Sequence, residues 1–218
     1  MRRISAMWAA LLACAVWLSA PAAAETGVSN DETYAVETTA IGGATTDGMG
    51  TWDARIAELH EGDPAVVEAF NHASRNAAGE QIDRAKLESN PGEQWHFESD
   101  GQVAFRSIAV GQLIVGTHYY GAHPRTYIST VVIDSRNADP ITLTDLFVDG
   151  QSGLNRLSEL TGAEPRAENF ANWFPTADGL EIHFAPYRFG IALPETKTVA
   201  WAALADLLAP VMAGITQA

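Results

Sequence analysis

The stretch DPAVVEAFNHASRNAAGEQIDRAKLESNPG, residues 63–92, decides the fold class. Asp63 is a good N-cap residue and Pro64 is preorganised for the first helical position, so a helix begins here. Asn90-Pro91-Gly92 ends it. Between these signals an apolar stripe recurs at three- and four-residue spacing, made of Val66, Val67, Phe70, Ala73, Ala77, Ile82, Ala85 and Leu87. We therefore predict one long helix.

Strand-forming segments follow this helix. They are rich in Val, Ile, Tyr, Phe and Thr, which suit a pleated surface. The predicted strands lie at 95–97, 103–109, 113–120, 126–133, 170–174, 180–184 and 199–201. Ser99-Asp100-Gly101 is predicted as a turn between the first two. The short connections favour antiparallel neighbours.

Shorter helices are predicted in the C-terminal part. Ser152 is expected to cap a helix that ends at Gly162, and an apolar helix is expected over 203–212, interrupted at Pro210. Because the strands cluster between helices and do not alternate strictly with them, the fold class is α+β. We expect an antiparallel sheet packed on the one long helix, plus the shorter helices.

The chain before the long helix is less clearly patterned. Residues 25–32 are expected to be a flexible lead-in, and the apolar positions of an edge strand are Tyr34, Val36 and Ile41. Ile41-Gly-Gly and Asp47-Gly-Met-Gly are predicted loops. Residues 52–59 fit a strand and a helix equally well. The domain organisation is therefore a leader at 1–24, a flexible or edge-strand segment at 25–50, and a single domain at 51–218.

The first 24 residues are typical of a secretory signal. Arg2 and Arg3 precede an apolar run, and Ala22 and Ala24 give the small-x-small pattern of a cleavage site. We predict cleavage after Ala24 and a secreted or periplasmic location in the cell envelope. A retained membrane anchor is the weaker alternative, because the run is shorter than the roughly 20 residues of a spanning helix. A lipid-attachment site at Cys14 is a second alternative, which the bulky residue two positions before it disfavours.

Charge restricts the partners of the mature chain. The chain has 13 Lys and Arg against 27 Asp and Glu, and loss of Arg2 and Arg3 leaves 11 against 27, a net charge of −16. This charge disfavours nucleic acid and anionic membrane surfaces and permits a cationic extracellular partner. Negative charge also keeps an exported protein soluble, which is the alternative interpretation. We expect a monomer. Without Cys14 there is no disulfide, thiol nucleophile or cysteine metal site.

The first candidate site is the stretch from Thr117 to Arg125, in which His118 and His123 flank two tyrosines. These residue types suit a general base, a metal pair or an aromatic recognition loop. A five-residue offset places two histidines on opposite faces of a strand unless the chain turns at Gly121, so a metal pair is disfavoured. The alternative is a hairpin whose tyrosines pack and whose His123 orders the turn by hydrogen bonding.

The second candidate site is the stretch from Glu181 to Gly190, an amphipathic strand followed by Pro186, Tyr187 and Arg188. Such residues anchor interfaces, so this stretch is a candidate rim of a binding groove. The alternative is that Phe184 and Tyr187 are core residues. The candidate binding residues are Tyr119, Tyr120, His123, Arg125, Tyr187 and Arg188.

No motif points to a catalytic residue, a metal or a cofactor. Gly150-Gln151-Ser152-Gly153-Leu154 approaches a nucleophile elbow but has Leu154 where the second glycine belongs. Neither a His-Glu-x-x-His motif nor a glycine-rich phosphate loop occurs. We therefore predict no metal and no cofactor.

The order of these motifs resembles the RsiV-like and PdaC-like extracytoplasmic domain family. Tyr119-Tyr120-Gly121-Ala122-His123-Pro124 and the strand after it are similar to the family signature. The other matching segments are 140–147, 169–170 with 176–184, 184–187 and 199–204. The resemblance covers about residues 95–208, with a looser fit back to Trp52. Many relatives have a second glycine where Ala122 stands.

The resemblance implies an α+β fold with a β-grasp-like sheet around a helix. The family includes lysozyme-binding sensors of anti-sigma factors, an accessory domain of peptidoglycan deacetylases, and small secreted mycobacterial immunogenic proteins, some described as esterases. The layout here is most similar to the last group. With neither a sigma-binding segment nor a deacetylase motif in the sequence, anti-sigma and deacetylase activities are not expected.

Three hypotheses follow. The first is a secreted binding module for a cationic cell-wall-active protein such as lysozyme, or for an envelope glycan. The second is a carboxylesterase-like hydrolase, and the third is an envelope structural protein without a discrete ligand.

Overall fold

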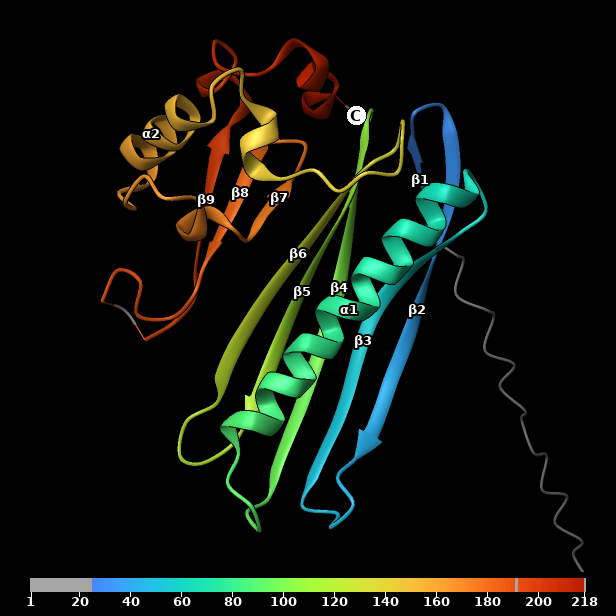
Figure 1. Cartoon of the computed structure of the whole chain (residues 1–218), viewed down its shortest axis with the longest axis vertical. Coiled ribbons are helices and arrows are strands. Elements are labelled where there is room, and N and C mark those ends of the chain that lie inside the picture. The colour runs from blue at the N-terminus through green and yellow to red at the C-terminus, as the bar shows by residue number, and fades with distance from the viewer. Residues whose placement is uncertain (1–24, 191, 218) are drawn as a thin grey trace, which may run out of the picture.

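The large sheet of the molecule has six strands (Figure 1). The computed structural model describes residues 25–190 and 192–217, so the predicted leader, its cleavage site and Cys14 lie outside the described residues. The sheet order is β1-β2-β3-β4-β5-β6, with antiparallel neighbours except for the parallel pair β3 and β4. The strands are β1 (Glu25–Ser29), β2 (Glu32–Ala44), β3 (Gly50–His60), β4 (Trp95–Arg106), β5 (Ala109–Tyr119) and β6 (Arg125–Asp134).

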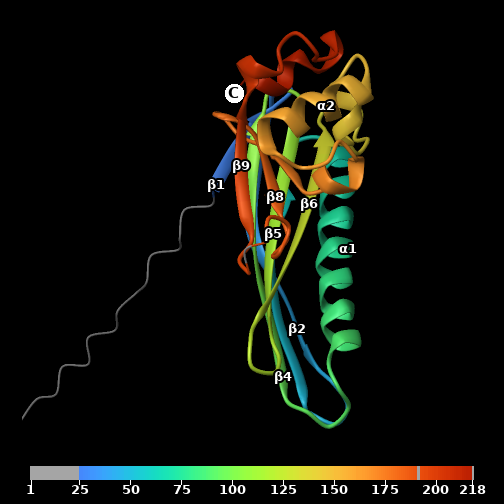
Figure 2. The same ribbon diagram turned by 90° about the vertical axis from the view of Figure 1, so that its left-hand side faces the viewer.

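Helix α1 (Pro64–Glu88) joins the two parallel strands and covers one face of this sheet (Figure 2). Its N-cap is Asp63, whose carboxylate accepts hydrogen bonds from Ala65 N at 2.8 Å and Val66 N at 3.3 Å. Val66, Phe70, Ala78 and Ile82 bury one side of the helix against the sheet. The long helix predicted from residues 63–92 is therefore confirmed, including its start.

A second sheet of three strands stands on the opposite face of the large sheet, near one end of it. Alternate residues of β5 and β6 show this arrangement. Ala109 and Val132 belong to the core beneath the second sheet, whereas Val110 and Val131 belong to the core beneath α1. The elements of this part are η1 (Leu143–Leu146), α2 (Gly150–Thr161), η2 (Ala167–Phe170), β7 (Trp173–Pro175), β8 (Gly179–Phe184), β9 (Glu195–Ala200), η3 (Trp201–Ala203) and η4 (Pro210–Thr216).

The α+β, β-grasp-like arrangement is confirmed as a mostly antiparallel sheet on one long helix, and the second sheet is an addition to it. The N-terminal part differs from the expectation. Residues 25–29 form β1, paired with β2, and are not a lead-in. Strand β2 continues through Ile41-Gly-Gly, and residues 52–59 lie in strand β3. Pairing with neighbouring strands overrides the weak local pattern here.

The predicted turn at Ser99-Asp100-Gly101 is wrong, because these residues lie inside β4. The parallel ladder between β3 and β4 ends at the pair Ala54 and Ser99. Beyond it, the side chain of Gln112 in β5 crosses above Gly101 to β3. Its Nε2 donates to Ala57 O at 2.8 Å, and its Oε1 accepts from Ala57 N at 3.1 Å. A Cβ at position 101 would lie 2.5 Å from Gln112 Oε1, so the glycine makes room for this crossing.

Two C-terminal details also differ. Asp149 is the N-cap of α2, accepting from Ser152 N at 3.0 Å, so Ser152 lies inside the first turn. The predicted end at Gly162 is confirmed, with φ of 80°. In place of an apolar α-helix over 203–212, the chain has the short 3-10 segments η3 and η4, the second beginning at Pro210. Proline lacks the N–H that a continuing helix needs.

Candidate functional site

A groove of about 1130 Å³ runs beside β6, between the C-terminal end of α1 and the segment after β8. It brings together the two candidate stretches, which are some 60 residues apart in the chain. The candidate residues that line it are Tyr120, His123, Arg125 and Tyr187. Each stretch supplies one wall, so the groove exists only in the folded protein.

Two candidate residues do not line the groove. Tyr119 points to the other side of β5, where its hydroxyl donates to Glu98 at 2.7 Å and its ring stacks on His96 at 6.2 Å. Arg188 is exposed in the segment after β8 and has no ion pair within the part of the chain that the structure describes. The alternation of side chains along a strand separates Tyr119 from Tyr120.

The base of the groove is organised around the Glu88 carboxylate. It accepts hydrogen bonds from Arg84 Nε at 2.8 Å, Arg125 Nη1 at 2.6 Å and the Tyr127 hydroxyl at 2.8 Å. Burial alone would raise the pKa of Glu88, but these hydrogen bonds outweigh it and lower the pKa to about 2. Burial and the bond to Glu88 raise the pKa of Tyr127, which therefore stays protonated.

His118 lies beneath this cluster and is fully buried. Its Nε2 is 3.0 Å from Ser89 Oγ and its Nδ1 is 3.0 Å from the Tyr127 hydroxyl. The ring stacks on Tyr120 at 5.6 Å. Burial lowers the pKa of His118, so the imidazole is neutral at pH 7. His118 is thus a positioning residue for the tyrosines of the site.

His123 lies apart from His118, on the loop between β5 and β6. The chain turns at Gly121, which has φ of 67°. No hydrogen bond within residues 25–190 and 192–217 involves the His123 ring, so the expectation that it orders the turn is wrong. The same residues contain no group of three His, Cys, Asp or Glu placed to hold a metal ion.

The rim of the groove carries an exposed aromatic side chain. Tyr187 is 72% exposed, whereas Phe184 is 2% exposed and belongs to the core. The core interpretation of this stretch therefore holds for Phe184 and fails for Tyr187. Tyr187 has φ of 69°, a conformation that costs a non-glycine residue on the order of 1 kcal/mol. The turn that contains Tyr187 therefore keeps this strained side chain exposed to solvent.

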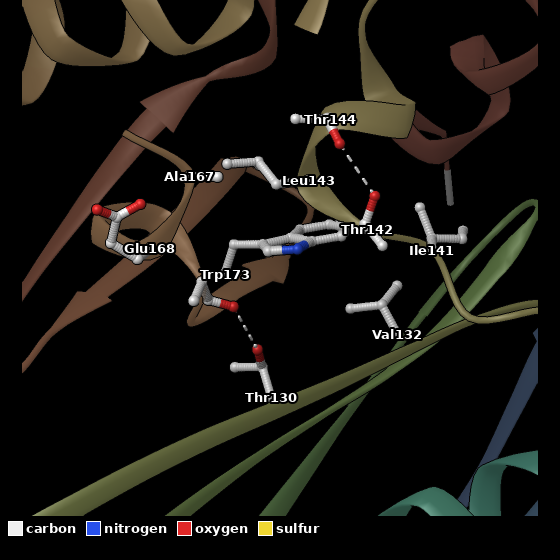
Figure 3. Close-up of a pocket in the computed structure, with 10 residues that line it drawn as sticks. Thr130, Val132, Ile141, Thr142, Leu143, Thr144, Ala167, Glu168 and Trp173 are labelled. Atoms are coloured by element: carbon white, nitrogen blue, oxygen red, sulfur yellow. Dashed lines mark hydrogen bonds between the residues drawn. The ribbon is translucent and has the colours of Figure 1, made fainter. Parts of the chain in front are cut away.

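A second cavity, of about 400 Å³, lies farther along β6 (Figure 3). Thr130 and Val132 of β6 form one wall, and Leu143 lies across from them. The Trp173 indole lies between Leu143 and Val132 (Figure 3). The two cavities therefore follow the same strand, one beside residues 125–128 and the other beside residues 130–132.

Four residues of the two cavities were not predicted from the sequence: Arg84, Glu88, Tyr127 and Trp173. Arg84 and Glu88 carried a local signal, since they are four residues apart on the exposed side of the helix. Their meeting with Arg125 depends on how α1 lies on the sheet, which no local pattern reports.

Comparison with known proteins gives a match in fold. No family model matches the sequence, and no curated protein matches it. A solved DUF3298 family protein from Bacteroides fragilis NCTC 9343 superposes with a TM-score of 0.55 at 12% identity, covering 84% of this chain and 97% of that one. A DUF3298 family protein from Pseudomonas aeruginosa PAO1 gives a TM-score of 0.56 at 13% identity, covering 81% and 95%. The fold is therefore similar to that of DUF3298 family proteins.

The described residues include no helix that is both long enough and apolar enough to cross a membrane.

Proposed function

We propose that this protein is a binding module that acts outside the cytoplasm and recognises its partner through the groove beside β6. The observation that carries the proposal is that the groove gathers four candidate residues from two distant stretches. Tyrosine and arginine side chains supply large contact areas and directed hydrogen bonds at modest entropic cost. The strain at Tyr187 adds support, because strained residues cluster at sites of function.

A cationic cell-wall-active protein, with lysozyme as the representative, is the proposed partner. Of the 11 Lys and Arg after Ala24, nine are in ion pairs within the residues that the structure describes, and the exceptions there are Arg106 and Arg188. The 27 acidic residues thus give a negative field that little positive charge interrupts. Such a field attracts a cationic protein and increases its association rate.

Retention of the mature protein on immobilised lysozyme tests this proposal. We expect retention at low salt that weakens as the Debye length falls below about 10 Å near 0.1 M salt. Tyr187→Ala should weaken binding about tenfold, and Tyr119→Ala is the matched control, because Tyr119 is also exposed but lies outside the groove. Sedimentation with insoluble peptidoglycan, using the same variants, tests an envelope glycan. Equal losses in both variants, or no retention on either material, would reject the proposal.

A second function, an esterase-like hydrolase, is favoured by one observation. Ser89, His118, Tyr127 and Glu88 form a continuous chain of hydrogen bonds. However, the single hydroxyl proton of Ser89 also has Ala85 O as an acceptor at 2.8 Å, closer than His118 Nε2 at 3.0 Å. Donation to that helix carbonyl withholds the proton from the general base. Ser89 also caps the negative end of α1, which opposes a developing oxyanion.

The hydrolase is tested with a short-chain activated ester. If it is the function, Ser89→Ala should abolish turnover and Ser152→Ala should not. Turnover that persists in Ser89→Ala would remove this mechanism.

A further inference from the structure

Strand β6 is the last strand of the large sheet, and part of its outer edge is unpaired. Near its C-terminal end, Ile141 N donates to Val132 O at 2.8 Å and Asp134 N donates to Asp139 O at 2.8 Å. Val132 and Asp134 therefore direct their backbone groups away from β5. Because this direction alternates along a strand, Thr126, Ile128 and Thr130 also present their N–H and C=O groups outward.

No hydrogen bond within the described residues reaches these six outward groups. Within the described residues, no further strand of the sheet lies beyond β6. The backbone bonds to residues 139–141 involve Val132 and Asp134, and none involves a residue of β6 before Val132. Exposed edges are usually blocked by proline, lysine or a covering segment. Here the edge residues are two threonines and an isoleucine, and a groove lies beside them.

The two sides of this edge differ in chemistry. On the α1 side lie the guanidinium groups of Arg84 and Arg125, whose side chains are 63% and 56% exposed. Each guanidinium group has five N–H bonds. Arg84 donates to Glu88 through Nε, and Arg125 donates to Glu88 through Nη1. The remaining donors are available to an acidic group in the groove.

On the other side the groove is largely apolar. Ile128 projects to this side, because it has the same alternation as Val132 in the core beneath the second sheet. The other residues of this wall are Asn172, Ala185, Pro186, Tyr187, Ala192, Leu193 and Pro194. An occupant lying along the edge therefore meets unused guanidinium N–H donors on one side and apolar surface on the other.

The second cavity lies where such an occupant would end. Trp173 is 3% exposed, and no hydrogen bond within the described residues uses its indole N–H. By contrast, the indole N–H of Trp201 donates to Thr176 O at 2.9 Å. The Trp173 ring lies in the cavity lining (Figure 3), where a terminal apolar side chain has room to anchor.

We propose that the edge of β6 from Thr126 to Thr130 binds an extended polypeptide segment of a partner protein as an added strand. The segment alternates acidic side chains, directed to Arg84 and Arg125, with apolar side chains, directed to the Ile128 wall. Side chains of a strand alternate between two faces, which matches the two unlike walls. About five residues, roughly 17 Å of strand, cover this edge. The inference rests on the proposed function and specifies how the groove binds a segment of its partner.

The test uses synthetic peptides and the mature protein. The probe is a blocked heptapeptide of alternating valine and glutamate, and its binding is measured by calorimetry. Two further peptides carry N-methyl groups, one on every valine and one on every glutamate. Only one of these two sets of N–H groups faces β6 in an added strand. We expect one methylated peptide to lose at least about tenfold in affinity, about 1.4 kcal/mol, and the other to stay within about threefold of the parent. Equal affinities of the two methylated peptides, or a parent that does not bind, would overturn the inference.

Ile128→Pro tests the same point from the side of the protein. Proline removes the outward N–H, but the bonds to β5 use the backbone of Tyr127 and Ser129, so the sheet is retained. We expect about tenfold weaker peptide binding, with Ile128→Val close to wild type. If Ile128→Pro does not fold, which circular dichroism reports, the methylated peptides decide alone.

The two proposals fail in different ways. If Ile128→Pro binds lysozyme as the wild type does while Tyr187→Ala does not, the binding module stands and strand addition is wrong. If the peptide binds as expected but neither lysozyme nor peptidoglycan is retained, the proposed partners are wrong and strand addition stands.

Discussion

Two of the polar clusters between α1 and the large sheet differ in whether all of their hydrogen-bond donors are used within the protein. The Gln112 amide bonds to Ala57 N, Ala57 O and Ser74 Oγ, and all three residues are buried. The Glu88 cluster lies at the C-terminal end of the helix and leaves guanidinium N–H groups directed at a groove. The Gln112 cluster therefore has no donor left for a ligand, whereas the Glu88 cluster has unused guanidinium donors.

This difference separates structural from functional polar groups. Buried polar groups that satisfy one another fix the arrangement of strands. Polar groups that retain unused donors beside a cavity are suited to recognition. We therefore assign the Gln112 cluster to the fold and the Glu88 cluster to the site, and the following substitutions test that assignment.

The largest effect is expected for Gln112→Ala. It leaves the N–H and C=O of Ala57 buried without partners, because β4 no longer pairs with β3 at this level. We expect a loss of about 3 kcal/mol in the free energy of unfolding, measured with urea, and no loss of peptide or lysozyme affinity once the protein is folded. A loss below about 1 kcal/mol would show that the cluster is not what holds β3 to β5.

Glu88→Gln should have a smaller effect that depends on pH. The pKa of Glu88 is lowered from 4.5 to about 2, so its ionised form stabilises the folded state above pH 4.5, and this contribution is lost as pH falls toward 2. At pH 7 we expect Glu88→Gln to be less stable by about 1–2 kcal/mol, after allowance for solvent screening. The difference from wild type should shrink between pH 4.5 and pH 2 in urea titrations. A difference that stays constant over this range would contradict the assignment.

The smallest effect on stability is expected for Tyr187→Gly. Glycine relieves the positive φ at this position, but it also gives the unfolded chain more freedom. We expect a change within about 0.5 kcal/mol in the free energy of unfolding, together with the same loss of partner affinity as in Tyr187→Ala. A marked loss of stability would mean that Tyr187 is a packing residue.

Local signals were sufficient for much of the fold. The cap at Asp63, the stripe of α1 and the stop at Gly162 each depend on residues within a few positions of one another. The turn predicted at Ser99-Asp100-Gly101 was wrong because the reason for the glycine lies in a residue distant in the sequence. Gly101 is needed for a side chain that arrives from β5, and no pattern within β4 reports that crossing.

The site was predictable only in pieces. The tyrosine and histidine stretch and the segment after β8 were both selected by residue type, but nothing in either indicates that they face each other. Glu88 was not selected, because a carboxylate near the end of a helix is ordinary until Arg125 and Tyr127 approach it. The separation of Tyr119 from Tyr120 depends on the register of β5, which is set by its neighbours.

The crossing of Gln112 over Gly101 also constrains how this sequence can evolve. Any residue with a Cβ at 101 would displace the amide, because that atom would lie 2.5 Å from Gln112 Oε1 and 2.9 Å from Ala57 N. A shorter residue at 112 would remove the Oε1 contact, but Ala57 N at 2.9 Å and Ile56 Cα at 3.1 Å would still crowd a Cβ at 101. Glutamine at 112 therefore requires glycine at 101, and glycine is expected to be inherited at 101 even where position 112 changes.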